Sequence, residues 1–220
     1  MIDLHTHTVF SDGVLIPSEL VRRAENAGYR AIAITDHVDF SNYEQVLENL
    51  WKTVEVLNEE TSLVVIPGVE ITHVPPKKIP ELILKCKEMG AAIVVVHGET
   101  VVEPVAPGTN RAAIEGGADI LAHPGLIAKE DVKLAVENGV YLEITARKGH
   151  NTTNGYVVKV GRELGAKFVI NTDAHTPGDL ITREFAVVVG RGAGLTMEEV
   201  EECFVNSECL VRLAKERMMF

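Results

Sequence analysis

This sequence of 220 residues places histidines and carboxylates at or just after the ends of short apolar runs. Both residue types bind divalent metal ions, through nitrogen and oxygen respectively. The pair of His5 and His7 is weak evidence alone, because eight histidines in a chain of this length produce about 0.3 His-x-His pairs by chance. Their positions say more, since most of them end or directly follow short apolar runs. These residues are His5, His7, Asp36, His37, Glu70, His97, His123, Asp173 and His175.

The apolar runs are predicted to be β-strands, and segments with helical periodicity alternate with them. The predicted strands cover residues 2–5, 31–35, 63–70, 92–97, 119–123, 140–145 and 167–172, with one more at 185–189. The predicted helices cover residues 17–27, 43–60, 80–89, 111–115, 129–138 and 155–164, followed by a helical tail over about 196–217. Alternation of buried strands with helices favours a parallel sheet in an α/β fold.

Seven or eight strand–helix units fit a small, distorted (β/α) barrel, and an open doubly wound sheet is the alternative. In both folds the carboxyl ends of the strands meet on one face, so we expect these side chains to converge there. Each residue also has a structural interpretation, as a hydrogen-bonded histidine or a helix-capping aspartate. Recurrence at successive strand ends favours metal binding instead. Nitrogen and oxygen donors without a thiolate suit Zn²⁺, Mn²⁺ or Fe²⁺, and about nine donors imply two or three ions.

The composition excludes several classes of protein. Lys and Arg total 21 and Asp and Glu total 32, and the resulting net charge of -11 argues against long nucleic acid or an anionic membrane as partner. A small anionic substrate stays compatible, because bound metal ions reverse the local charge. Apolar runs such as residues 91–96 are shorter than the ~20 residues of a membrane span. The first residues lack signal-peptide features. The three cysteines, Cys86, Cys203 and Cys209, lack CxxC spacing, so we expect them to be reduced thiols. Both observations favour a cytoplasmic location.

Seven short motifs occur in a recognisable order. They are His5-Thr6-His7-Thr8, Ser11-Asp12-Gly13, Thr35-Asp36-His37, Pro67-Gly68-Val69-Glu70, Val96-His97-Gly98, Ala122-His123-Pro124-Gly125 and Thr172-Asp173-Ala174-His175. As a set they resemble the polymerase and histidinol phosphatase (PHP) superfamily, over residues 3 to about 180. The resemblance implies a distorted seven-stranded (β/α) barrel of the PHP type, and a single domain over residues 1–220. It also implies a metal-dependent phosphoesterase with a site for three ions.

Carried over by position, the resemblance implies a ligand set for each ion. The first ion would be held by His5, His7, Glu70 and Asp173, the second by Glu70, His97 and His123, and the third by Asp12, His37 and His175. Several relatives have histidine where this chain has Asp12. The harder carboxylate ligand favours Mn²⁺ or Fe²⁺ there, or weakens the third ion's binding. We expect Asp36 to orient His37 rather than to bind an ion.

The implied reaction is hydrolysis of a small phosphomonoester by a hydroxide that two metal ions share. The catalytic residues would be Glu70, Asp173 and His7, with Glu70 setting the distance between the two ions as a bridging ligand. The sequence contains no P-loop, nucleophile elbow or cysteine-based phosphatase signature. A nucleophile from the protein is therefore not expected.

Four residues near the predicted site could bind the substrate phosphate. Arg147, Lys148 and His150 follow the strand at 140–145, and Arg183 lies in the loop after His175. The first two could equally belong to a solvated loop, and the histidine could instead donate a proton to the leaving group.

Two further residues have open roles. A buried glutamate needs a partner, so we expect Glu143 to pair with Arg147 or Lys148, or to support a metal ligand. His73, in a proline-rich loop on the same face, either shapes the entrance or belongs to a rigid surface loop.

Several functions remain open at this stage. L-histidinol phosphate is a candidate substrate, although the chain leaves little room for insertions that cover one. The alternative is a phosphoesterase directed at a nucleoside mono- or bisphosphate or at the 3′ end of an oligonucleotide. The acidic net charge and the aromatic content of 5% argue against long single strands as its substrate. An amidohydrolase-like C–N hydrolase is less expected, because Glu70 stands where that superfamily usually has a bridging lysine. A non-catalytic PHP module is also less expected, because all nine ligand positions are kept.

Overall fold

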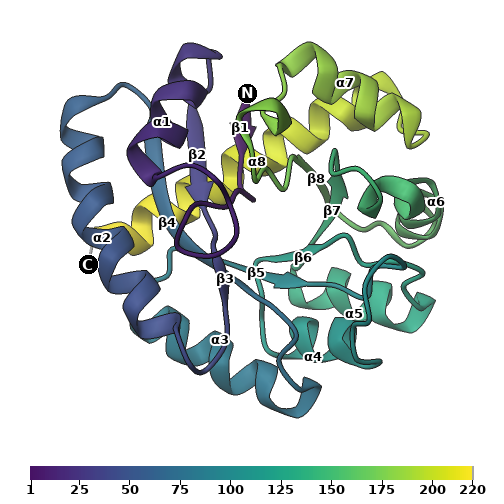
Figure 1. The fold of residues 1–220 in the computed structure, drawn as a ribbon. Helices are drawn as coiled ribbons and strands as arrows, with labels where there is room; N and C mark the ends of the chain where they lie inside the picture. The colour runs from purple at the N-terminus through teal and green to yellow at the C-terminus, as the bar shows by residue number, and fades with distance from the viewer. Residues whose placement is uncertain (220) are drawn as a thin grey trace.

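Parallel strands and helices alternate around a nearly closed barrel (Figure 1) in this computed structural model, which describes residues 1–219. The last residue of the predicted domain, Phe220, lies outside the described residues. The strands are β1 (Ile2–Asp3), β2 (Ala31–Ile34), β3 (His37–Val38), β4 (Val64–Ile71), β5 (Ile93–His97), β6 (Ile120–Ala122), β7 (Tyr141–Thr145) and β8 (Phe168–Asn171). The α-helices are α1 (Pro17–Asn26), α2 (Tyr43–Glu60), α3 (Ile79–Glu88), α4 (Thr109–Glu115), α5 (Lys129–Asn138), α6 (Asn154–Leu164), α7 (Arg183–Gly192) and α8 (Met197–Met218).

The sheet has the order β1-β2-β4-β5-β6-β7-β8, and every pair in it is parallel. The short strand β3 continues the path of β2 and pairs with the second half of β4. Beyond β1 and β8, a parallel bridge between Thr6 and Ala174 brings the two ends of the sheet together, and His7 N donates to Ala174 O at 2.8 Å. The barrel prediction is therefore confirmed over the open-sheet alternative.

Side chains alternate between the two faces of the sheet, as the period of two requires. Residues such as Ala33, Ile66 and Val95 pack inside the barrel, whereas their neighbours pack against the surrounding helices. Helix α8 contributes Leu210 and Val211 to the interior cluster, and Figure 1 shows it running across the barrel behind the strands. Because α8 fills the amino end, the carboxyl end is the face left for a site.

One expected strand is a helix, and one short strand was not expected. The predicted strand at 185–189 is part of helix α7, which begins where the side chain of Thr182 accepts a hydrogen bond from Phe185 N at 3.2 Å. The valines of this segment favour a strand, but helical spacing lets Ala186 and Gly190 bury against the barrel. Strand β3 was not predicted, because two residues carry no periodicity.

No helix of the described residues is long and apolar enough to cross a lipid bilayer.

Candidate metal centre

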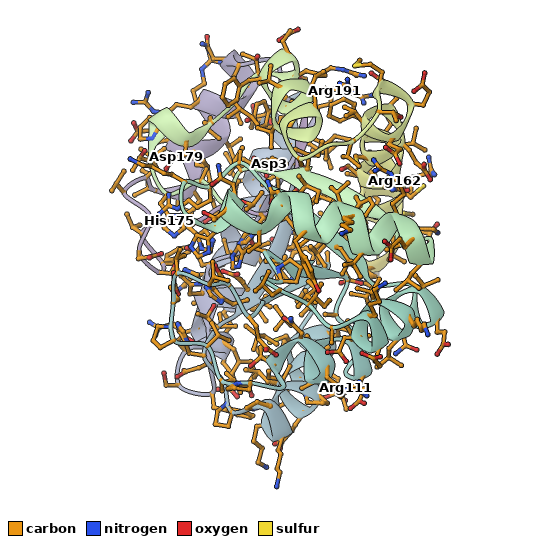
Figure 2. All side chains as sticks on the ribbon, turned by 90° about the vertical axis from the view of Figure 1, so that its right-hand side faces the viewer. Asp3, Arg111, Arg162, His175, Asp179 and Arg191 are labelled. Carbon is orange, nitrogen blue, oxygen red and sulfur yellow. The ribbon has the colours of Figure 1, made fainter. Side chains whose placement is uncertain are left out.

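All nine residues expected as metal ligands lie together at the carboxyl ends of the strands. The first two follow β1, and the others lie in or just after β3, β4, β5, β6 and β8, with one on the loop before α1. They are His5, His7, Asp12, His37, Glu70, His97, His123, Asp173 and His175. Figure 2 shows His175 beside Asp179 at one edge of the molecule, whereas Arg162 and Arg191 lie on the opposite side. Parallel strands thus gather these residues from across the sequence.

Glu70 occupies the middle of this cluster and is completely buried. Its Oε2 atom lies 3.2 Å from His5 Nε2, 3.5 Å from His7 Nε2 and 2.8 Å from His37 Nδ1. Its Oε1 atom lies 3.7 Å from His123 Nε2. Because its two oxygens face different imidazoles, this carboxylate has the position that a bridging ligand needs.

Asp173 is the second carboxylate in the middle of the cluster. Its Oδ1 atom lies 3.2 Å from His7 Nε2 and 3.7 Å from His5 Nε2, and its Oδ2 atom lies 3.7 Å from His123 Nε2. Both this aspartate and His123 have positive φ angles, 53° and 26°. Residues other than glycine adopt such angles at an energetic cost, which is characteristic of functional sites.

Several buried polar atoms of the cluster make no hydrogen bond within the protein. Eight buried side-chain nitrogen or oxygen atoms of the described residues have no such partner, and seven of them belong to this cluster. They are His5 Nε2, both ring nitrogens of His7, both oxygens of Glu70, His123 Nδ1 and Asp173 Oδ1. Each unpaired buried polar atom costs about 1–3 kcal/mol. Divalent ions would satisfy the carboxylate oxygens and one lone pair on each imidazole, so the residues fit the metal centre that the sequence predicts.

The proton positions on two rings support the same interpretation. His175 Nδ1 donates to the Asp173 carbonyl at 2.9 Å, and His5 Nδ1 lies 2.8 Å from Glu143 Oε1. A carbonyl or carboxylate oxygen only accepts, so Nδ1 carries the proton and the neutral ring has a lone pair at Nε2. These Nε2 atoms lie 3.1 Å from Asp12 Oδ1 and 3.2 Å from Glu70 Oε2. When such a ring is neutral, its lone pair and the carboxylate oxygen repel each other unless a cation lies between them.

Burial sets the charges of the cluster. It lowers the pKa of His7 and of His123 well below the ordinary value, and neighbouring imidazoles lower it further. Burial raises the pKa of Asp173 to about 7. It would also raise the pKa of Glu70, but the imidazole of His5 and its neighbours hold that pKa well below its ordinary value. The neutral rings of His7 and His123 beside an anionic glutamate offer nitrogen and oxygen ligands to a divalent cation.

Two buried carboxylates hold the ligands in place without joining them. Glu143 contacts neither Arg147 nor Lys148 through an ion pair. It supports the ligand His5 instead, and it also accepts hydrogen bonds from Asn171 Nδ2 at 3.0 Å and His123 N at 3.2 Å. Of the two roles expected for Glu143, the structure therefore shows the second, in which it supports a predicted metal ligand.

Asp36 differs from its expected role. Its carboxylate accepts from Thr8 N, Thr8 Oγ1 and Ser11 Oγ, each at 2.7 Å, and so orders the loop that carries Asp12. His37 is instead held by Thr72 Oγ1, 2.7 Å from its Nδ1. The expectation that Asp36 orients His37 was wrong, because its oxygens are already used by the neighbouring loop.

The four expected phosphate-binding residues are not all brought to the site. His150 joins it, with its ring centroid 4.3 Å from that of His123 and its Nδ1 2.9 Å from Thr100 Oγ1. Arg147 lies at the edge, where it donates to Asp179 Oδ2 at 3.2 Å. Lys148 is exposed on the loop between them.

Arg183 lies away from the cluster. Its guanidinium covers the Phe204 ring at 4.3 Å and pairs with Glu201 on α8. Its charge acts on the amino group of Met1, which precedes β1 at the amino end of the barrel. The loop after His175 returns the chain to that end, which the sequence pattern did not indicate.

Glu103 is the residue that the sequence interpretation missed. It lies in the loop between β5 and α4, and its carboxylate meets the Nε2 atoms of His97, His73 and His150 at 3.2, 3.3 and 3.3 Å. No motif or periodicity surrounds it, and its contacts come from distant parts of the chain. Only the fold identifies it as part of the site.

Comparison with known proteins gives relatives along nearly the whole chain. The PHP domain model matches residues 3–101. The uncharacterized protein MJ1295 of Methanocaldococcus jannaschii is 57% identical over 206 residues, which cover 93% of this chain and 94% of that protein. The probable phosphatase Teth514_1060 of Thermoanaerobacter sp. (strain X514) is 28% identical, over 91% of this chain and 89% of that protein.

Solved structures have the same fold. A chain in the cryo-EM structure of archaeal ribonuclease P with mature tRNA superposes with a TM-score of 0.72 at 17% identity, over 99% of this chain and 91% of that chain. Histidinol phosphate phosphatase from Lactococcus lactis, complexed with zinc, L-histidinol and phosphate, has a TM-score of 0.58 at 14% identity, over 95% and 93%. At these identities the likeness concerns the fold alone.

Proposed function

The chain belongs to the PHP domain family and is a hydrolase of the phosphatase type, and on this premise we propose that it releases phosphate from a small phosphomonoester, with L-histidinol phosphate as the first candidate substrate. The observation that carries this proposal is the set of seven unpaired buried polar atoms around Glu70. It supports a centre for divalent ions at the open end of the barrel. A relative named as a probable phosphatase supports the reaction type.

Each ion would have its own set of ligands from this chain. His5, His7, Glu70 and Asp173 would hold the first ion, Glu70, His97 and His123 the second, and Asp12, His37 and His175 the third. Zn²⁺, Mn²⁺ or Fe²⁺ bound there would supply water of lowered pKa and positive charge for the phosphoryl oxygens. Glu70 offsets that charge from the middle of the cluster. Glu143 fixes the direction of the His5 lone pair.

Residues at the edge of the cluster would handle the substrate. His150 is the group that we assign to proton donation to the leaving group, because its ring lies beside that of His123 and its Nδ1 is held by Thr100. Arg147 would contact the phosphate through guanidinium nitrogens that the single bond to Asp179 leaves free.

A cleft beside the third ligand set supports a small leaving group. It is an open depression of about 470 Å³, lined by Asp12, His37, Asp39, Asn42 and Thr72, among others. The Asp39 carboxylate in its wall, which is not assigned to an ion, favours a leaving group that carries positive charge. The ammonium group of L-histidinol has that charge, whereas a nucleoside does not.

The proposal is tested by phosphate release from a panel of substrates. The panel contains L-histidinol phosphate, several nucleoside monophosphates and a nucleoside 3′,5′-bisphosphate, with protein of measured metal content reloaded separately with Zn²⁺, Mn²⁺ and Fe²⁺. A preference in kcat/KM for L-histidinol phosphate supports the assignment. A preference for nucleotides keeps the phosphatase and replaces the substrate. No release with any metal, at two or more bound ions per chain, overturns the proposed function.

A further inference from the structure

We propose that Glu103 is a further metal ligand, which binds the ion held by His97 and brings His73 into the same coordination sphere. The inference rests on the metal centre of the proposed function and adds to it two residues that lie outside the seven sequence motifs. It concerns the loop between β5 and α4 (residues 98–108) and the turn after β4.

The distances are those between ligands of one ion. Glu103 Oε2 lies 3.2 Å from His97 Nε2 and 3.3 Å from His73 Nε2. Nitrogen and oxygen ligands that are each ~2.0–2.2 Å from a tetrahedral ion stand about 3.3–3.5 Å apart. The three atoms also lie within 4.8 Å of one another, so one ion can reach all of them.

Nδ1 of His97 carries a proton, as Nδ1 does on His5 and His175. His97 Nδ1 donates to the Gly98 carbonyl at 3.1 Å, so Nε2 is the nitrogen left to bind an ion, and it faces the Glu103 carboxylate. The same relationship joins His5 to Glu70 and His175 to Asp12, where ions are expected for independent reasons. Glu103 therefore has the same position relative to His97, with an oxygen about 3.2 Å from Nε2, as Glu70 has to His5 and Asp12 to His175.

Glu103 is also the carboxylate that His97 meets in this structure. Within 4.0 Å, the oxygens of Glu70 contact four imidazoles of the described residues, those of His5, His7, His37 and His123. The ring of His97 is not among them, and its Nε2 atom points to the loop instead. An ion on this nitrogen consequently has Glu103 as its nearest anionic ligand.

The backbone of His73 supports its inclusion. Three residues other than glycine have a positive φ in residues 1–219, namely His73 at 54°, His123 and Asp173, and the other two are predicted ligands. The left-handed conformation costs energy for a residue with a Cβ and persists where the surroundings require it. Here it brings the His73 ring to a centroid distance of 5.2 Å from His97.

The loop that carries Glu103 is held at its base. Glu99 accepts hydrogen bonds from Gly108 N at 2.9 Å and Asn110 N at 3.0 Å, and Asn110 Nδ2 donates to Pro124 O at 2.9 Å. These bonds tie the two ends of the loop to each other and to the segment after β6. Glu103 is thus presented to the histidines from a closed loop.

Metal binding by the full chain tests the inference. The variants are Glu103→Gln, Glu103→Asp and His73→Gln, with Glu130→Gln as control because it removes an exposed carboxylate from the first turn of α5. Bound Zn²⁺ is counted by elemental analysis, and its affinity is measured by competition with a chelator. We expect Glu103→Gln to lose one ion per chain or to bind it about 10- to 100-fold more weakly. The aspartate variant should retain part of the affinity, and the control should match the native protein.

Two readouts keep the outcomes separate. Circular dichroism confirms that each variant is folded, and the visible absorption of the Co²⁺-loaded protein reports the loss of a ligand. An unchanged Zn²⁺ count and affinity in folded Glu103→Gln would overturn the inference and leave Glu103 as the ion-pair partner of a protonated His97. Phosphate release is measured separately, so failure of the native protein to release phosphate overturns the proposed function without deciding the ligand question.

Discussion

The Oε1 atom of Glu143 lies 2.8 Å from Nδ1 of His5, and both side chains are fully buried. The contact fixes the proton on the far side of the ring from Glu70. Nε2 is consequently the nitrogen of His5 that faces Glu70 and is available to a cation. Strand β7 thus supplies the support for a ligand that follows β1.

Replacing Glu143 with glutamine tests this support. The amide keeps the shape but can present NH₂ to Nδ1, which permits the wrong tautomer of His5. We expect metal affinity or kcat/KM to fall about 10- to 100-fold, as for other partners of ligating histidines. Chelator competition and phosphate release measure the two effects. Native values for both would show that His5 does not depend on Glu143.

Replacing Glu70 with alanine should abolish phosphate release. The change removes the carboxylate that contacts four imidazoles, so at least one ion should be lost as well. Elemental analysis and turnover of the folded variant are the measurements. Native turnover in this variant would contradict the role given to Glu70 in the centre.

Removing the metal should destabilise the folded protein. An ion that binds only the folded state at 1,000 times its Kd contributes about 4 kcal/mol to the free energy of unfolding. For a chain of this size, that corresponds to a decrease in Tm of roughly 8–16 °C. Thermal unfolding before and after dialysis against a chelator measures it, and re-addition of Zn²⁺ or Mn²⁺ should restore the Tm. Equal Tm values would mean that the unpaired atoms of the cluster bind no ion.

Replacing Gly13 with alanine should displace the loop that carries Asp12. A Cβ at this position would lie 2.4 Å from the carbonyl oxygen of His7, which cannot move without disturbing the centre. We expect a loss of about 1–3 kcal/mol in stability and weaker binding of the third ion. Gly192→Ala is the matched control, since its Cβ would meet nothing within 4 Å. Equal losses in the two variants would exclude the close contact as the cause.

The two arginines expected at the phosphate should behave differently. Arg147→Ala should raise KM, because this residue lies at the edge of the cluster beside Asp179. Arg183→Ala should leave KM unchanged, because its side chain packs on Phe204 at the other end of the barrel. Steady-state kinetics with the best substrate of the panel compares them. An increase in KM for Arg183→Ala alone would reverse this assignment.

Much of the fold was predictable because parallel strands in a barrel are short, apolar and regularly spaced. The position of Glu70 or His123 at a strand end was enough to place it on the correct face. Glu103 was not predictable, because its contacts with His73 and His150 depend on how two loops fold over the barrel. Helix α7 was missed because its valines favour a strand locally, whereas packing against the barrel decides for the helix.

The position of helix α8 has a consequence for how the protein is made. Its residues Leu210 and Val211 complete the interior of the barrel, yet they are made long after the strands against which they pack. The bridge between Thr6 and Ala174 likewise joins the start of the chain to a distant segment. Such long-range contacts form late in folding. The nascent chain therefore carries its histidines without the site that unites them, and metal is acquired only after helix α8 has been made.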